Sequence, residues 1–165
     1  PEKYPGHQPL ATSLPDLLPM LGSEWKQIDD NVLGEWYTYL VLAHGWQPHT
    51  RLATVTGRQA AAGWAGDRYR VYHNPASQQT VLIQRWLWEN STEADEFWNA
   101  FQNYAKFRWG VPATRADSQL TWTGTPDGEV TLLHYSRETL WLIAPNAAIS
   151  AAIMDELDAH LEQDS

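Results

Sequence analysis

The sequence predicts an α+β domain: a mainly antiparallel sheet of about five strands with helices packed on one face, in the order ααββαβββα. Two patterns predict this class. Short segments rich in β-branched and aromatic residues are separated by turn residues, and longer segments carry apolar residues at helical spacing. The length of 165 residues and the lack of internal repeats favour a single domain.

We assign residues 19–165 to this domain and residues 1–18 to an extended, proline-rich arm or linker on the surface. The chain starts at Pro1, without an initiator methionine or the apolar core of a signal peptide. We therefore expect an internal start: either a leader and upstream sequence have been cut away, or the chain is one part of a larger protein. An arm of this kind implies a partner that it contacts.

Two helices are expected before the first strand. Residues 29–31, Asp-Asp-Asn, supply a helix start, the stretch to His44 has apolar residues at helical spacing, and Gly45 is the natural stop. A second helix from about Thr50 to Ala62 is a weaker prediction because it contains Gly57. It leads into the sequence Gly-Trp-Ala-Gly-Asp-Arg-Tyr at 63–69.

A hairpin, a helix and two further hairpins follow. Residues 68–73 and 80–88 form the first hairpin, and a helix begins at the Asn90 cap and ends before Gly110. Three more strands are predicted at 119–123, 130–135 and 139–144. The last helix starts at an Asn146 cap and ends in the acidic tail Glu162-Gln163-Asp164.

Composition excludes several functions. The net charge of −9 repels phosphate backbones, so a nucleic acid partner is not expected. The chain has no cysteine, which excludes thiol nucleophiles and cysteine-built metal sites. No apolar run is long enough for a membrane span. No phosphate-binding loop or nucleophile motif is present, so we assign no catalytic residue and expect no cofactor.

The most informative segment is the turn around Trp64. Glycines on both sides of Trp64 allow positive φ or a close backbone approach, and the indole is expected to be buried there. We expect Asp67 and Arg68 to form a clamp, in which the carboxylate caps N–H groups of the turn and the guanidinium pairs or stacks on a nearby indole. This geometry fits a structural corner or a ligand site containing Trp64, Gly66, Asp67 and Arg68.

Other side chains are weaker candidates. Glu35, next to Trp36, would have a raised pKa if it were wedged among aromatic rings, and it could then serve as a pocket acid. Among the ten tryptophans, those that could form an exposed stacking surface are Trp86, Trp88 and Trp122.

The six histidines give no metal-binding pattern, although two of them could face each other across the sheet. These two are His73 and His134. The others are His7, His44, His49 and His160. We therefore predict no metal site.

Several segments together resemble the C-terminal half of a family of exported bacterial and archaeal proteins. They are Pro1-Glu2-Lys3-Tyr4, Leu14-Pro15-Asp16-Leu17 with Leu21-Gly22 and Trp25, Leu33-Gly34-Glu35, and residues 60–69. In that family the upstream half looks like a zincin-type metallopeptidase domain with a His-Glu-x-x-His helix. No counterpart of that motif occurs here, so only Trp64, Gly66, Asp67 and Arg68 carry over.

The resemblance implies a non-catalytic accessory domain of an exported, metallopeptidase-like surface protein, serving packing, substrate presentation or assembly. Its implied location is extracellular or at the cell surface, and its implied partner is an upstream domain, another protein chain or a second copy. Two alternatives stay open. One is a tryptophan-rich module that binds glycans or peptides, and the other is a hydrolase with a carboxylate in a pocket.

Overall fold

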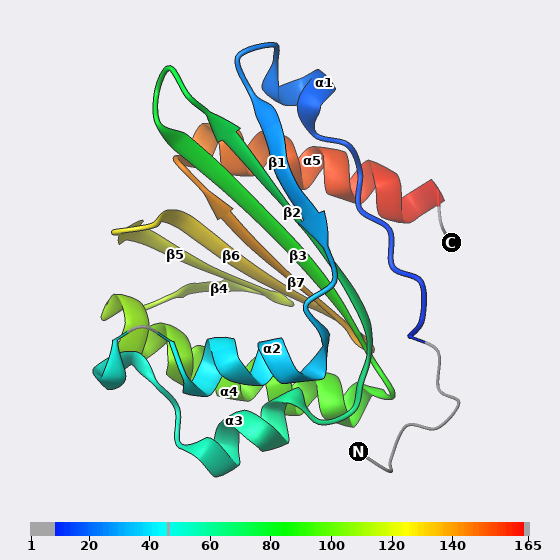
Figure 1. Ribbon diagram of the computed structural model, residues 1–165, viewed down its shortest axis with the longest axis vertical. Coiled ribbons are helices and arrows are strands. Elements are labelled where there is room, and N and C mark those ends of the chain that lie inside the picture. The colour runs from blue at the N-terminus through cyan, green and yellow to red at the C-terminus, as the bar shows by residue number, and fades with distance from the viewer. Residues whose placement is uncertain (1–8, 46, 164–165) are drawn as a thin grey trace.

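The structure is a computed structural model of the chain, and it describes residues 9–45 and 47–163 (Figure 1). Its centre is a seven-stranded antiparallel sheet with the strand order β1-β2-β3-β7-β6-β5-β4. The strands are β1 (Lys26–Asn31), β2 (Trp64–Asn74), β3 (Gln79–Trp88), β4 (Thr114–Ala116), β5 (Gln119–Thr125), β6 (Gly128–Tyr135) and β7 (Glu138–Ala144).

Five α-helices and one short 3-10 helix accompany the sheet. They are α1 (Leu18–Leu21), α2 (Gly34–Ala43), η1 (Pro48–Thr50), α3 (Thr54–Ala61), α4 (Ser91–Trp109) and α5 (Ala147–Gln163). None of the helices in the described part of the chain has the length and apolarity needed to cross a membrane. The seven-stranded antiparallel sheet and its helices confirm the predicted α+β class.

Helices cover both faces of the sheet, so the expectation of a single covered face is wrong (Figure 1). Even- and odd-numbered positions of β3 point to opposite faces of the sheet. Trp86 packs in a cluster with α2, α3 and α4, whereas Ile83 packs in a cluster with α1 and α5. Because the central strands are apolar at both alternating positions, each face needs its own cover.

Two edge strands, β1 and β4, escaped the sequence-based prediction, which gave five strands in the order ααββαβββα. Residues 29–31 were expected to start a helix, but they end β1, and α2 begins only at Gly34. β1 is almost entirely exposed and polar, and its pairing with β2 is interrupted at Ile28, so it lacks the alternation of a buried strand. β4 has only three residues, all exposed.

The second expected helix is shorter than predicted. η1 covers its first residue, and α3 spans only Thr54–Ala61. Gly57 lies inside α3 at its contact with α2, where an added Cβ would come within 2.7 Å of the Ala43 Cβ atom. Gly57 therefore lowers helix propensity but permits the two helices to pack closely.

Apart from β4, the elements from β2 to α5 follow the prediction closely. Asn90 accepts hydrogen bonds from Thr92 N and Glu93 N at the start of α4, and Gly110 ends that helix with φ +67°. Hairpins join β2 to β3, β5 to β6 and β6 to β7, and Asn146 caps α5 through Ile149 N. Strong local signals at each boundary explain this agreement.

Some predicted features lie outside the described residues: Pro1, Pro5, His7, Trp46 and Asp164. The rest of the predicted arm, residues 9–17, differs from a surface linker because it packs into the fold. Leu14 and Leu17 are buried beneath α1 and α5, with 5% and 0% of their surface exposed. The backbone N–H of Leu10 donates to the carbonyl of Ala65 in β2 over 2.8 Å.

Substitution of Gly66 by alanine is expected to destabilise the protein by about 1–3 kcal/mol, because its Cβ would lie 2.3 Å from the Leu10 carbonyl oxygen. The Leu10 atom in this clash belongs to the backbone and the added Cβ is fixed to the β2 backbone, so the arm must move away from β2. Urea unfolding monitored by tryptophan fluorescence measures the loss. Gly45→Ala is the control, since its nearest contact would be an ordinary 3.6 Å. Equal stability of the two variants would contradict the prediction.

Candidate functional site

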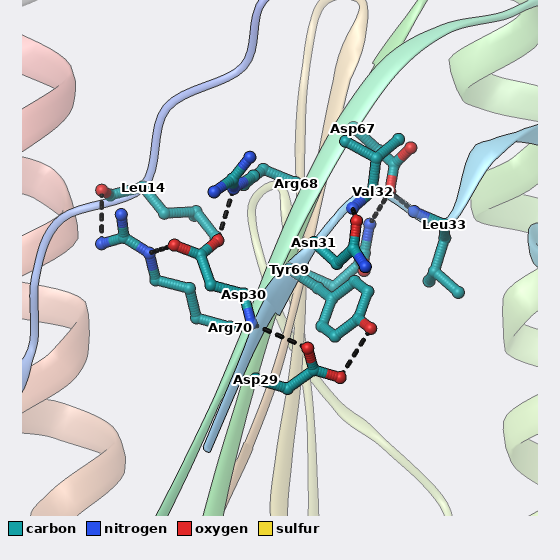
Figure 2. A network of polar contacts seen from close by, with 11 residues as sticks. Leu14, Asp29, Asp30, Asn31, Val32, Leu33, Asp67, Arg68, Tyr69 and Arg70 are labelled. Atoms are coloured by element: carbon teal, nitrogen blue, oxygen red, sulfur yellow. Dashed lines mark hydrogen bonds and ion pairs between the residues drawn. The ribbon is translucent and has the colours of Figure 1, made fainter. Parts of the chain in front are cut away.

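A network of polar side chains connects β1, β2, the arm and the start of α2 (Figure 2). We call it the β1–β2 network, and its charged and hydroxyl members are Asp29, Asp30, Asp67, Arg68, Tyr69 and Arg70. Three of these members, Asp67, Arg68 and Tyr69, belong to residues 63–69, which we call the Trp64 segment. Its members divide between the two faces of the sheet.

The Asp67 carboxylate is buried, with 2% of the residue exposed, and accepts four hydrogen bonds. Two donors are the backbone N–H groups of Leu33 and Gly34 at the start of α2, at 2.8 and 2.9 Å. The other two are the side chains of Trp64 and Gln84, at 2.9 and 2.8 Å. A carboxylate at a helix N-terminus is stabilised by the helix dipole as well as by these donors.

Asp67 therefore supplies a cap that α2 does not have in its own sequence. The residue before the helix is Leu33, which has no side-chain acceptor, and Gly34 at the first helical position has φ +76°. Although the Asp67 cap comes from a strand more than 30 positions away, it satisfies the same orphan N–H groups that a local serine or aspartate would.

The expected clamp between Asp67 and Arg68 is wrong. Consecutive strand residues point to opposite faces, so the two side chains lie on different sides of β2. Arg68 instead donates to Asp30 of β1, and Asp67 caps α2 rather than its own turn. The Trp64 indole, which was expected to be buried in the turn, donates to Asp67 and is only partly buried.

On the side of β2 that carries Arg68 and Arg70, the network connects β2 to β1 and to the arm. Asp30 accepts from Arg68 and Arg70, and Arg70 also donates to the Leu14 carbonyl oxygen over 3.0 Å. The hydrogen bond from Arg68 and the charge of Arg70 lower the pKa of Asp30, against an opposing effect of burial. On the opposite side of the strands, Tyr69 donates to Asp29 over 2.8 Å, and this bond raises the pKa of Tyr69 (Figure 2).

The two glycines of the segment have different roles. Gly63 has φ +73°, and an added Cβ would lie 2.3 Å from the Glu93 side chain. Gly66 has ordinary φ but is crossed closely by the arm. Both positions thus require glycine to let protein segments approach each other.

Glu35 lies in the first turn of α2 and is partly buried. The aromatic residues beside it, Trp36 and Tyr37, are 62% and 59% exposed, so they do not enclose the carboxylate as expected. An acidic residue in the first turn interacts favourably with the helix dipole.

The three tryptophans considered as an exposed stacking surface are core residues: Trp86, Trp88 and Trp122 are 1%, 0% and 2% exposed. Trp86 donates to Thr38 and Trp88 donates to Thr139, each over 3.0 Å, so their indole N–H groups are satisfied inside the protein. The expected surface contact is wrong because this face of β3 and β5 is covered by the aromatic stripe of α4.

Sequence reasoning missed the exposed apolar residues around the start of α2. The described residues include eight exposed large hydrophobic side chains, and four of them lie within residues 28–37. We call this the 28–37 surface, and its members are Ile28, Val32, Trp36 and Tyr37. The face of α2 that points to the core carries Thr38, Tyr39, Leu42 and Ala43. Trp36 and Tyr37 are therefore left on the exposed side of the helix, and their adjacent positions in the sequence were a usable signal for this exposed pair.

The described residues include no group of three or more histidines, cysteines or acidic residues that could hold a metal ion. His73 and His134 do not face each other, since β3 and β7 lie between their strands. His73 is 3.3 Å from the Thr80 hydroxyl, and His134 is 3.2 Å from Asp95.

Comparison with known proteins yields one match. The family model described as "Domain of unknown function (DUF8575)" matches residues 21–154, which include all seven strands and the first part of α5, up to Met154. Neither a curated protein nor a solved structure matches the chain.

Asp67→Asn is expected to lower the free energy of unfolding by about 3 kcal/mol, because the amide removes the charge and turns one acceptor into a donor facing other donors. Urea unfolding measures the effect. Asp29→Asn, at an exposed bond to Tyr69, serves as control and should cost less than about 1 kcal/mol. Similar losses in both variants would contradict the role of Asp67.

Asp30→Asn is expected to destabilise the protein at neutral pH but not in acid. Since the folded-state pKa of Asp30 is lowered, its contribution is complete above the unfolded pKa of about 4 and is lost as the pH falls through the folded value. Urea unfolding of the unsubstituted protein and of Asp30→Asn, from neutral pH down to a pH below the folded-state value, measures the difference in stability. In an Arg68→Gln, Arg70→Gln background the difference should largely vanish, and its persistence there would contradict the ion-pair origin.

Proposed function

The chain belongs to the DUF8575 family, and from this premise we propose that it is a non-catalytic accessory domain that docks onto a partner protein domain through the 28–37 surface. The observation that carries the proposal is the exposure of Trp36 and Tyr37, at 62% and 59%, at consecutive positions in the first turn of α2. Tyrosine and tryptophan are the residue types enriched at the centres of protein interfaces.

The use of the Trp64 segment inside the fold supports a non-catalytic role. The carboxylate of Asp67 is buried and accepts four internal hydrogen bonds, Arg68 pairs with Asp30, and Gly66 contacts the arm. A catalytic acid or base must reach the proton that it transfers, and a carboxylate enclosed by protein donors does not reach substrate.

The same segment holds the 28–37 surface in place. Asp67 binds Leu33 N and Gly34 N between Val32 and Trp36, while Asp30 and Asp29 bind side chains of β2. A surface whose backbone is fixed before binding loses less conformational entropy when a partner docks. The β1–β2 network thus fixes the backbone that carries the 28–37 surface.

The partner in this proposal is the metallopeptidase-like domain of the exported proteins that the sequence resembles, and the location is extracellular or at the cell surface. Docking there would serve packing, substrate presentation or assembly. A second copy of the chain is the other partner that the experiment below distinguishes.

The glycan or peptide module is a second candidate, now resting on Trp36 and Tyr37 instead of the buried indoles. Two neighbouring exposed rings are able to stack on a sugar. Quenching of tryptophan fluorescence by a glycan series would favour it. The hydrolase alternative requires Asp67 or Glu35 to act on substrate, and turnover that is lost in the folded Asp67→Asn or Glu35→Gln variant would support it.

Alanine at both Trp36 and Tyr37 is expected to weaken partner association at least about tenfold while changing stability by less than about 1 kcal/mol, because both side chains are mainly exposed. The natural polypeptide is first isolated and its intact mass measured. Hydrogen exchange at residues 28–37 is then compared between it and the 165-residue chain.

Slower exchange in a larger natural polypeptide would support docking onto another part of the same chain, and association in sedimentation would support a second copy. Val55→Ser in α3, at a residue with 76% exposure outside this surface, is the matched control. Equal exchange in both proteins together with monomeric sedimentation would overturn the proposal.

A further inference from the structure

A pocket of about 530 Å³ lies between the C-terminal half of α4, the turn after it and strands β4 and β5. It is separate from the β1–β2 network and from the 28–37 surface. Its wall residues are Gln102, Lys106, Gly110, Val111, Pro112, Ala113, Arg115, Leu120 and Trp122. The volume falls within the range of pockets that hold small organic ligands.

The pocket carries two cations and no acid among its wall residues. Lys106 and Arg115 are both exposed, and no carboxylate of the described residues forms an ion pair with either. By contrast, Arg68, Arg70, Arg85 and Arg108 each pair with an aspartate or glutamate. Lys26 and Arg137 also have no carboxylate partner among the described residues, so the local feature is that two cations and no acid line one pocket in a chain with a net charge of −9.

The inner wall of the pocket is apolar and rigid. Trp122 and Leu120 are buried in the α4-side core, and the Trp122 ring lies 5.5 Å from that of Trp109 and 6.1 Å from that of Phe101. Arg115 lies over the Trp98 ring, with its guanidinium carbon 6.0 Å from the ring centroid. This stacking restricts the guanidinium without neutralising its charge.

From this combination we infer that the pocket binds a small amphiphilic anion, with a carboxylate between Lys106 and Arg115 and an apolar body against the accessible side chains of Val111, Pro112 and Ala113 above the buried Trp122 floor. Charge-assisted hydrogen bonds from the two cations would hold the carboxylate. The overall negative charge opposes long polyanions, but its field is screened over about 8–10 Å at physiological salt, so a single carboxylate can still enter.

The inference is tested by calorimetric titration of the 165-residue chain with octanoate and with octanamide, its uncharged counterpart. Octanoate is expected to bind at least about tenfold more tightly, and its affinity should fall as salt is added. Amide shifts at Gly110 and Ala113 in nuclear magnetic resonance spectra would place the ligand in the pocket.

The pocket variant Lys106→Gln, Arg115→Gln is expected to lose about tenfold in octanoate affinity, with single Lys106→Gln showing a part of that loss. The matched control is Lys26→Gln, Arg137→Gln, which removes the same number of exposed cations outside the pocket. Melting curves confirm that each variant is folded. No saturable octanoate binding up to about 10 mM, equal binding of octanamide, or equal losses in pocket and control variants would overturn the inference.

Discussion

The buried carboxylate of Asp67 is the interaction on which the arrangement of β1, β2 and α2 depends. It brings together backbone donors of the β1–α2 junction, the Trp64 indole at the start of β2 and the Gln84 amide of β3. A buried charge is tolerated only when donors surround it, so the four donors and the carboxylate require one another. Because α2 lacks a local cap, the start of this helix is determined by a strand that follows it in the chain.

The opposite side of β2 shows the same principle with partly buried charges. Asp30 joins Arg68 and Arg70, and Arg70 reaches the arm at Leu14. Gly66 lets the arm cross β2 closely enough for a backbone hydrogen bond nearby, from Leu10 to Ala65. The Trp64 segment therefore organises three neighbours at once: α2 on one face, β1 at the edge, and the arm on the other face.

This division of labour guides the functional interpretation. The residues of the Trp64 segment stabilise the fold, whereas the surfaces that are available for a partner lie elsewhere. The 28–37 surface leaves aromatic rings in water, and the α4–β5 pocket holds Lys106 and Arg115 without carboxylate partners among the described residues. A suitable partner lowers the free energy when it covers exposed aromatic rings or places an anion beside cations that have no carboxylate partner.

The sequence by itself determined the α+β class, the hairpins and α4, because local signals decide these: alternation, turn residues, the Asn90 cap and the Gly110 stop. It misassigned residues 29–31, since Asp-Asp-Asn favours a helix cap and only the ladder with β2 shows that they form an edge strand. Tertiary structure alone decided that Asp67 caps α2 and that Trp86, Trp88 and Trp122 are buried. Those outcomes depend on which segments meet in space, and residue types at distant positions do not encode that pairing in any local pattern.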